Sequence, residues 1–226
     1  MIERNYPCFA TINRNVYNKQ NIYYCMLSYK LSEMVLKAIE NSPMGITNLE
    51  VLESLSLSGP FTLKTTLSRL NKSGRIIRLK RGVYSSNPMR DVYACAQALF
   101  NGYLGFSTAL YLRGLISELP FTVTVVTASK SFTKTFAAYQ FKAVALKEKA
   151  VGFENKGPYV VSTRAKSLFD CIYLPKYSIE QEKLVNAFKD ASLLPSEWRE
   201  FRHYVKKFAV GDISKRFLNV ERAIKG

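Results

Sequence analysis

The chain has 226 residues, 47% of them hydrophobic, which is enough for one large domain or two smaller ones with a packed core. Its 33 Lys and Arg residues outnumber 17 Asp and Glu residues, and the net charge of +16 favours a polyanionic partner such as nucleic acid. No apolar run reaches the roughly 20 residues of a membrane-spanning helix, and the first residues lack the apolar core of a signal peptide. We therefore expect a cytoplasmic protein without a membrane span.

Cysteine and histidine content argues against several kinds of site. The four cysteines (Cys8, Cys25, Cys95 and Cys171) are widely scattered without a CxxC pair, so neither a zinc site nor a disulfide framework is indicated. His203 is the only histidine, whereas Ser/His and Cys/His catalytic sites and multi-histidine metal sites need an imidazole beside a specific partner. We expect neither a metal nor a cofactor.

Residues 1–30 are predicted to form an arm. They hold six aromatic residues and a single acid, Glu3, without the sustained periodicity of a helix or a strand. A poorly ordered tail, an over-extended start with Met26 as the initiator, and an arm that contacts DNA all fit this composition.

Three helices are expected between residues 31 and 74. Apolar residues at helical spacing predict a first helix, which ends before Pro43 because the residue preceding a proline is pushed out of the helical conformation. Thr47 is expected to cap a second helix, which runs through Leu57, in a T-x-x-E capping box. A third helix is expected to begin at Pro60, where the missing N–H costs nothing, and to end before Gly74.

The third helix lies in a stretch without acids, since the 27 residues from Gly59 to Ser85 contain seven Lys or Arg and no Asp or Glu. Three leucines at i, i+4 and i+7 predict a buried stripe, which consists of Leu63, Leu67 and Leu70. The residues roughly opposite on the helical wheel are Thr62, Thr65, Arg69 and Lys72. One face is therefore apolar, and the other is polar and cationic.

A short basic hairpin is expected after this helix. The sequence RIIRLKRGVYS alternates apolar and basic side chains, and its Lys80-Arg81-Gly82 is a turn signal. Three helices followed by a basic hairpin predict a winged helix-turn-helix domain over residues 31–86, whose second and third helices form the DNA-reading pair.

This domain explains the lack of acids, because carboxylates would repel DNA phosphates whereas Lys and Arg release condensed counterions. We assign Arg69 and Thr65 to base edges in the major groove, and Thr62 and Lys72 to groove walls or phosphates. The basic hairpin residues are assigned to a wing that contacts the backbone or the minor groove. A solvated basic face on an ordinary helical domain is the alternative. The full predicted DNA-binding set is Thr62, Lys64, Thr65, Arg69, Lys72, Arg75, Arg78, Lys80 and Arg81.

A second domain, α+β in class and ending in helices, is expected over residues 87–226. Helical spacing predicts helices at residues 91–100, 107–115, 163–173, 178–192, 195–208 and 212–224. Ser107 is expected to cap the second of these helices. Apolar and β-branched runs predict strands at residues 119–127, 139–146, 150–154 and 158–162. The fold class of the whole chain is therefore α+β.

Catalytic groups are sparse in this second domain. Residues 92–147 hold one acid, Glu118, so the clustered carboxylates that bind Mg²⁺ in nucleases and nucleotidyltransferases are missing. Asp170 is a lone carboxylate on a helix, better suited to a cap, a domain contact or an ion pair with Arg164 or Lys166 than to acid–base catalysis. No Gly-rich phosphate loop occurs. We expect that the protein is not an enzyme.

The hairpin pattern L-x-R-G-V-Y, the segment NGYLGFSTALYLRGL with LPFTVTVVT, and the segment STRAKSLFDCIY together resemble the AbiEi family of antitoxin-type transcriptional regulators. The resemblance covers residues 31–224. It implies a winged helix that binds double-stranded DNA at repeats in the protein's own promoter. It also implies an antitoxin domain that counteracts a nucleotidyltransferase-like toxin in a type IV toxin–antitoxin system of phage defence. The winged-helix role falls on Lys64, Thr65, Arg69, Arg78, Lys80 and Arg81.

Two positions depart from the family pattern. Arg113 replaces a common histidine and Arg164 replaces the usual glutamate, and both are expected at the surface. Asp170 matches the family's aspartate and is interpreted as structural.

Other functions stay open at this point. A stand-alone winged-helix regulator with a ligand-sensing or dimerising second domain follows from the same physics. An enzyme and a membrane-surface protein are the remaining classes. Repeated half-sites on DNA require either a homodimer or monomers that bind cooperatively.

Overall fold

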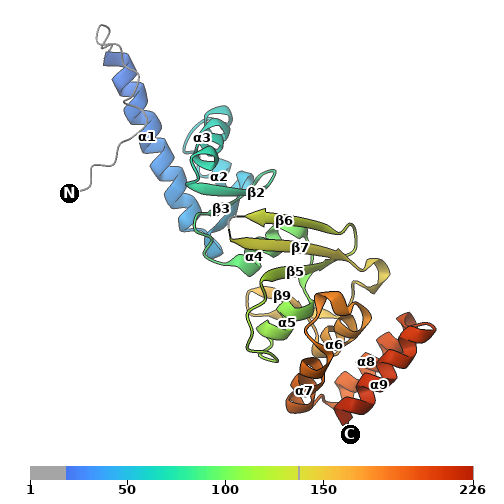
Figure 1. Ribbon diagram of the computed structural model, residues 1–226. Helices are drawn as coiled ribbons and strands as arrows, with labels where there is room; N and C mark the ends of the chain where they lie inside the picture. Colours follow the sequence, from blue (N-terminus) through green and yellow to red (C-terminus); the bar gives the residue numbers. More distant parts are fainter. Residues whose placement is uncertain (1–18, 137, 226) are drawn as a thin grey trace. The chain divides into compact units, whose positions relative to one another are not determined.

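The computed structural model describes residues 19–136 and 138–225 (Figure 1). The chain divides into two compact units. The first unit holds the described residues up to Arg78 together with Tyr84–Pro88. The second holds Leu79–Val83 and the described residues from Met89 onward. As predicted, the described part of the chain is α+β, with a three-stranded sheet and a six-stranded mixed sheet, and it ends in helices.

The first unit is built on three helices. Its elements are α1 (Lys19–Glu40), η2 (Pro43–Gly45), β1 (Ile46–Asn48), α2 (Leu49–Ser54) and α3 (Pro60–Lys72). The other strands of the small sheet are β2 (Ile76–Lys80) and β3 (Val83–Ser86), whose residues 79–83 are assigned to the second unit. The strand order in the small sheet is β1-β3-β2. The side chains of the buried core are Val35, Ile39, Leu52, Leu63, Leu67, Leu70, Ile76 and Tyr84. The leucine stripe predicted for the third helix is thereby confirmed.

Two boundaries in this unit differ from the prediction. The first helix begins at Lys19 rather than near residue 31, and no Gly or Pro interrupts residues 19–31. Part of the expected arm is therefore helical. The rest of that arm, residues 1–18, lies outside the described residues. The second helix is capped by Asn48, whose Oδ1 accepts the Val51 N–H at 2.8 Å. Thr47, the predicted cap, is a buried residue of β1 instead. This helix ends at Ser54, three residues earlier than predicted.

The second unit contains a six-stranded mixed sheet with the strand order β6-β7-β5-β4-β9-β8. The strands are β4 (Tyr103–Leu104), β5 (Thr122–Thr127), β6 (Phe132–Phe136), β7 (Tyr139–Ala145), β8 (Phe153–Lys156) and β9 (Tyr159–Ser162). Strand β5 pairs parallel with β7 and antiparallel with β4, and β4 pairs parallel with β9. The four predicted strands correspond to β5, β7, β8 and β9, whereas β4 and β6 were missed.

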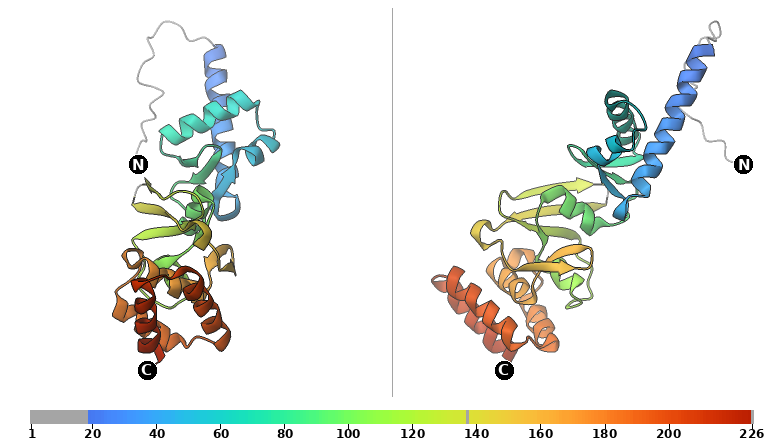
Figure 2. Two further views of the ribbon diagram at one scale, coloured as in Figure 1. Left: turned by 90° about the vertical axis from the view of Figure 1, so that its right-hand side faces the viewer. Right: turned by 180° about the vertical axis from the view of Figure 1, so that it is seen from behind.

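Six α-helices accompany this sheet within the described residues. They are α4 (Val92–Phe100), α5 (Phe106–Leu112), α6 (Arg164–Tyr173), α7 (Gln181–Ala191), α8 (Pro195–Phe208) and α9 (Asp212–Lys225), and short 3₁₀ turns occur at Lys147–Lys149 and Pro175–Tyr177. Helix α4 packs on β5, β7 and β9, and α6 contacts α5, α8 and α9 (Figure 2). The helix predicted over residues 91–100 is α4, and Asp91, at its predicted start, is the N-cap. The predicted cap of α5 is wrong, because the residue that precedes this helix is Gly105 and Ser107 lies inside it.

The strand β5 is buried on both faces. Val126 packs in the core that the sheet shares with α5 and α6. Val125 is also buried and must point to the opposite side of the sheet, because successive side chains of a strand alternate. The glycines beside β4 permit its close approach to β5. A Cβ atom on Gly102 would lie 2.1 Å from the Val126 carbonyl oxygen, and one on Gly105 would lie 2.5 Å from Val126 Cγ2.

The helical core of the second unit surrounds Phe169 of α6, whose ring stacks on Phe217 of α9 with centroids 4.9 Å apart. Residues 165–172 are all buried, so this helix is enclosed on every side rather than on the single predicted face. Among residues 19–136 and 138–225, none of the helices has both the length and the apolar character that a membrane span requires.

Candidate nucleic-acid interface

The exposed face of α3 carries most of the predicted DNA-binding residues. Leu63, Thr66, Leu67 and Leu70 point inward, whereas four predicted residues are exposed, namely Thr62, Lys64, Arg69 and Lys72. Thr65 is half-buried, and its Oγ1 donates a hydrogen bond to the Phe61 carbonyl oxygen at 3.0 Å. The helix brings these side chains onto one surface because its apolar residues recur with the helical period.

The cations of this face differ in their contacts. Lys64 Nζ lies 3.4 Å from a carboxylate oxygen of Glu53 in α2. Arg69 and Lys72 make no ion pair or side-chain hydrogen bond within the described part of the chain. Both lie in the last turns of α3, where cations also stabilise the helix dipole. These two side chains are therefore available to an anionic partner.

Arg75, a predicted DNA-binding residue, is placed differently. Its Nη2 lies 2.6 Å from Glu33 Oε1, and both side chains are about one-third exposed. This ion pair joins the segment after α3 to α1, and exposed pairs of this kind contribute little to stability. Unlike Arg69 and Lys72, Arg75 therefore already has a carboxylate partner in the folded chain.

The three cations of the basic hairpin β2–β3 differ in their exposure and in their hydrogen bonds. Arg78 is exposed, and its backbone N–H donates to Asn71 Oδ1 at 2.8 Å. Lys80 Nζ donates to Asn101 Oδ1 at 3.3 Å. Arg81 is exposed at the turn, which Gly82 closes with a φ of +76°. Of these cations, Arg78 and Arg81 present their guanidinium groups to solvent.

Phe61 was not among the predicted residues, although it lies at the centre of the exposed face. Its side chain is 85% exposed and lies among the predicted cations and threonines of this face. On a helical wheel of 100° per residue, Phe61 falls in line with Thr65 and Lys72, so the helical spacing alone could have revealed it. It stands in the first turn of α3, directly after Pro60.

A buried ion pair lies in α6, within the segment STRAKSLFDCIY. Lys166 Nζ contacts Asp170 Oδ1 one helical turn away, and both side chains are fully buried. Asp170 Oδ2 has no hydrogen-bond partner. Burial raises the pKa of the Asp170 carboxyl to about 6 and lowers the pKa of Lys166, and their mutual attraction opposes both shifts. The ion pair with Lys166, one of the alternatives expected for Asp170, is therefore the one observed.

Arg113 and Arg164, the two positions that depart from the pattern of the family that the sequence resembles, were both expected at the surface, but both are only partly exposed. The side chain of Arg113 is 8% exposed, pairs with Glu154 at 2.7 Å and donates from Nε to the Ser162 carbonyl oxygen at 2.6 Å. Arg164 is 24% exposed and lies 3.3 Å from Glu197. Both arginines are held by carboxylates that sequence patterns alone did not connect to them.

Within the described residues, no group of three or more His, Cys, Asp or Glu side chains could hold a metal ion. Comparison with protein-family models finds no match, and comparison with curated proteins finds no similar sequence. The charged surface of α3 is therefore the feature from which a function can be argued.

Proposed function

We propose that the protein is a DNA-binding transcriptional autorepressor of the AbiEi type. It would serve as the antitoxin of a type IV toxin–antitoxin pair and counteract a nucleotidyltransferase-like toxin. The observation that carries the DNA-binding half is α3, whose apolar side is packed and whose exposed side bears Thr, Lys and Arg without a single acid. Helices α2 and α3 with the hairpin β2–β3 follow the order of a winged helix-turn-helix.

In this proposal α3 enters the major groove of the DNA. Arg69 can donate two hydrogen bonds to guanine, and Thr65 and Phe61 contact neighbouring base edges, the phenyl ring against a thymine methyl group. Lys72 and Lys64 contact phosphates, which fix the orientation of the helix without reading sequence. In this proposal, the position of each residue on the exposed face of α3 decides whether it contacts a base or a phosphate.

The hairpin supplies further phosphate contacts through Arg78 and Arg81, because both side chains are exposed. Lys80 would contribute only after giving up its hydrogen bond to Asn101. We therefore assign less of the binding to Lys80 than to the other two cations.

The antitoxin half rests on the resemblance of the second unit to the family. The segment with α5 and the segment with α6 carry that resemblance, and both are part of a packed core. A direct check is growth of cells that express the neighbouring nucleotidyltransferase-like gene, with and without this protein. Growth inhibition that the protein relieves supports the antitoxin role, and inhibition that it leaves unchanged removes it.

The DNA-binding half is tested by fluorescence anisotropy with the duplex upstream of the protein's own gene and a shuffled duplex of the same composition. We expect tighter binding to the native duplex, and this preference should persist at physiological salt. Equal binding to both duplexes that collapses as salt rises would leave only counterion release, and the proposed autorepression would fail.

A second candidate is a stand-alone winged-helix regulator whose second domain senses a ligand or dimerises. The observation that favours it is the volume of the groove between α8 and α9, 710 Å³, which lies in the range of ligand sites; occupation of this groove by a partner helix, as proposed below, would leave the candidate without that ligand site. The candidates differ in the growth experiment, since the stand-alone regulator relieves no toxicity.

A further inference from the structure

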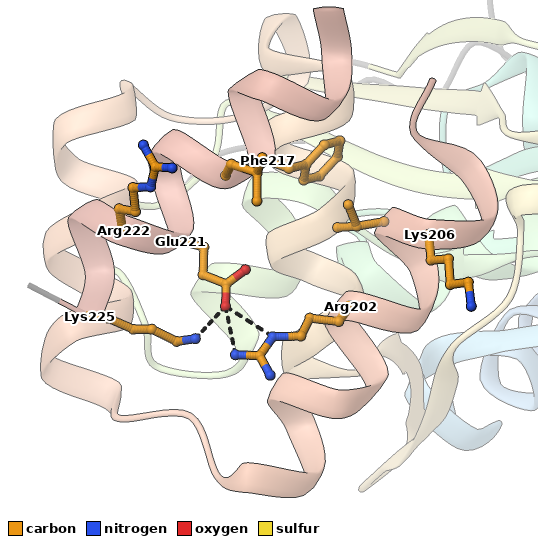
Figure 3. A pocket seen from close by; sticks show the side chains of 8 residues that line it. Arg202, Lys206, Phe217, Glu221, Arg222 and Lys225 are labelled. Atoms are coloured by element: carbon orange, nitrogen blue, oxygen red, sulfur yellow. Dashed lines mark hydrogen bonds and ion pairs between the residues drawn. The ribbon is translucent and has the colours of Figure 1, made fainter. Parts of the chain in front are cut away.

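A groove with an apolar wall and a cationic rim runs between α8 and α9 in the second unit (Figure 3). Its volume is 710 Å³, within the range of ligand sites in proteins. The lining residues are Arg202, Val205, Lys206, Phe217, Leu218, Glu221, Arg222 and Lys225. They span two turns of α9, or about 12 Å along its axis.

The apolar part of the groove exposes side chains that an ordinary helical hairpin would cover. Leu218 is 48% exposed and Val205 is half-buried, while Phe217 forms the floor and is itself buried in the core. Solvation of this wall is unfavourable, so a partner that covers it gains hydrophobic free energy.

The rim carries four cations against one carboxylate. That carboxylate, Glu221, accepts from Arg202 Nε at 3.0 Å and Nη2 at 2.8 Å and also contacts Lys225 Nζ. Although burial acts to raise it, hydrogen bonds from Lys225 and Arg202 hold the pKa of Glu221 below its ordinary value. Lys206 and Arg222 form no ion pair with any described residue, so the rim keeps a positive excess.

We propose that this groove binds an amphipathic helix of a partner protein, with an apolar stripe flanked by Asp or Glu. The stripe would cover Leu218 and Val205, and the acids would pair with Lys206 and Arg222, in the manner of a helix laid into a groove. A DNA duplex matches the charge but offers no apolar surface to the wall. A second copy of this chain, with its net charge of +16, does not match the charge.

The test uses the full-length protein and a fluorescein-labelled synthetic helix of about 14 residues, with Leu at i, i+3, i+4 and i+7 and Glu on both flanks. A peptide of the same composition with scrambled order is the control for charge. We expect the ordered peptide to bind at least about tenfold more tightly than the scrambled one, because only it presents an apolar stripe.

Three variants locate the binding. Lys206→Glu/Arg222→Glu reverses the rim and should weaken binding at least about tenfold, and Leu218→Gln should weaken it without a change in charge. Lys189→Glu/Arg199→Glu makes the same change in net charge at exposed positions outside the groove and should have a much smaller effect. Unchanged melting temperatures establish that the variants are folded.

Three results would overturn the proposal. These are no binding of the ordered peptide, equal binding of the ordered and scrambled peptides, or an equal loss in the rim and control variants. Displacement of the bound peptide by an unrelated DNA duplex, with loss of duplex binding in the rim variant, would assign the groove to nucleic acid instead. None of these outcomes depends on whether α3 reads DNA.

Discussion

Helices α3 and α6 both carry Lys and Arg side chains, but they use charge in opposite ways. On α3, Arg69 and Lys72 are exposed and have no acidic partner among the described residues. On α6, Lys166 is fully buried against Asp170. A buried charge is tolerated only with a partner, whereas an exposed acid-free face suits a polyanion. The comparison shows that the enclosure of a helix, rather than its composition, decides which role its cations have.

The largest effect is expected where the buried pair is broken. Asp170→Ala leaves the Lys166 ammonium buried without its partner and should lower the free energy of unfolding by about 3–5 kcal/mol. Denaturant titration measures this loss. The double variant Lys166→Met/Asp170→Leu replaces both charges with apolar groups of similar size and should be close to the wild type. A double variant as unstable as the single one would show that the charges themselves are required.

The pH dependence of this loss should differ from that of a surface carboxyl. The pKa of Asp170 is about 6 in the folded protein, above the ordinary value of 3.8 that applies to the unfolded chain. Between these two pH values the folded state therefore binds a proton at Asp170 more readily than the unfolded state does. The carboxyl therefore contributes stability that is present below about pH 4 and is lost as the pH rises through about 6. The cost of Asp170→Asn should be larger at pH 4 than at pH 7. A larger cost at pH 7 would contradict the raised pKa.

On the exposed face of α3, removal of a cation should lower stability by no more than about 1 kcal/mol, through the helix dipole, and its main effect should be on DNA binding. Arg69→Ala should weaken binding to the native upstream duplex by about 1–3 kcal/mol and binding to a shuffled duplex by less. Lys72→Ala should weaken both by similar amounts, because phosphates occur in every sequence. Anisotropy titrations measure the four affinities. Equal losses for Arg69→Ala on both duplexes would remove its base-reading role.

The contribution of Phe61 can be isolated on the DNA side. Replacing thymine with uracil in the native duplex removes only methyl groups, and at the contacted base it should cost about 0.8 kcal/mol. In Phe61→Ala the same replacement should have no effect, since the contact is already lost. An equal effect in both proteins would show that another residue meets the methyl group.

The smallest effect is expected for the half-exposed pair of Arg75 and Glu33. A double-mutant cycle with Arg75→Ala and Glu33→Ala should give an interaction energy below about 1 kcal/mol, measured by denaturant titration. A value near that of the buried pair would mean that the end of α3 is held far more firmly than its exposure suggests.

Local sequence signals were sufficient for α3, α4, α8 and several strands. Pro60 begins α3 as predicted, and its leucines recur with a clean helical period. Asp91 and Pro195 likewise stand at the starts of their helices. In these elements the residue preferences for helix ends and the pattern of burial agree, so each boundary was specified by a few neighbouring residues.

The rest depended on contacts between distant parts of the chain. Strand β6, FTKTF, has mostly exposed side chains and is a strand because it pairs with β7, which its own pattern does not reveal. The burial of Lys166 requires α5, α8 and α9 around α6, and local periodicity placed it outside. For the candidate interface, the cations of α3 could be predicted from sequence, whereas the pairing of Arg75 with Glu33 could not.

The central claim is that the exposed face of α3 binds DNA. The salt dependence of binding tests this claim most directly. The slope of log K against log salt should fall by about two in Lys64→Ala/Lys72→Ala, since each of these lysines is assigned to a phosphate and each phosphate contact releases about one counterion. Lys189→Ala/Arg199→Ala, which removes two exposed cations from α7 and α8, should keep the wild-type slope. A slope that is unchanged in the α3 variant and reduced in the control would contradict DNA binding by this helix.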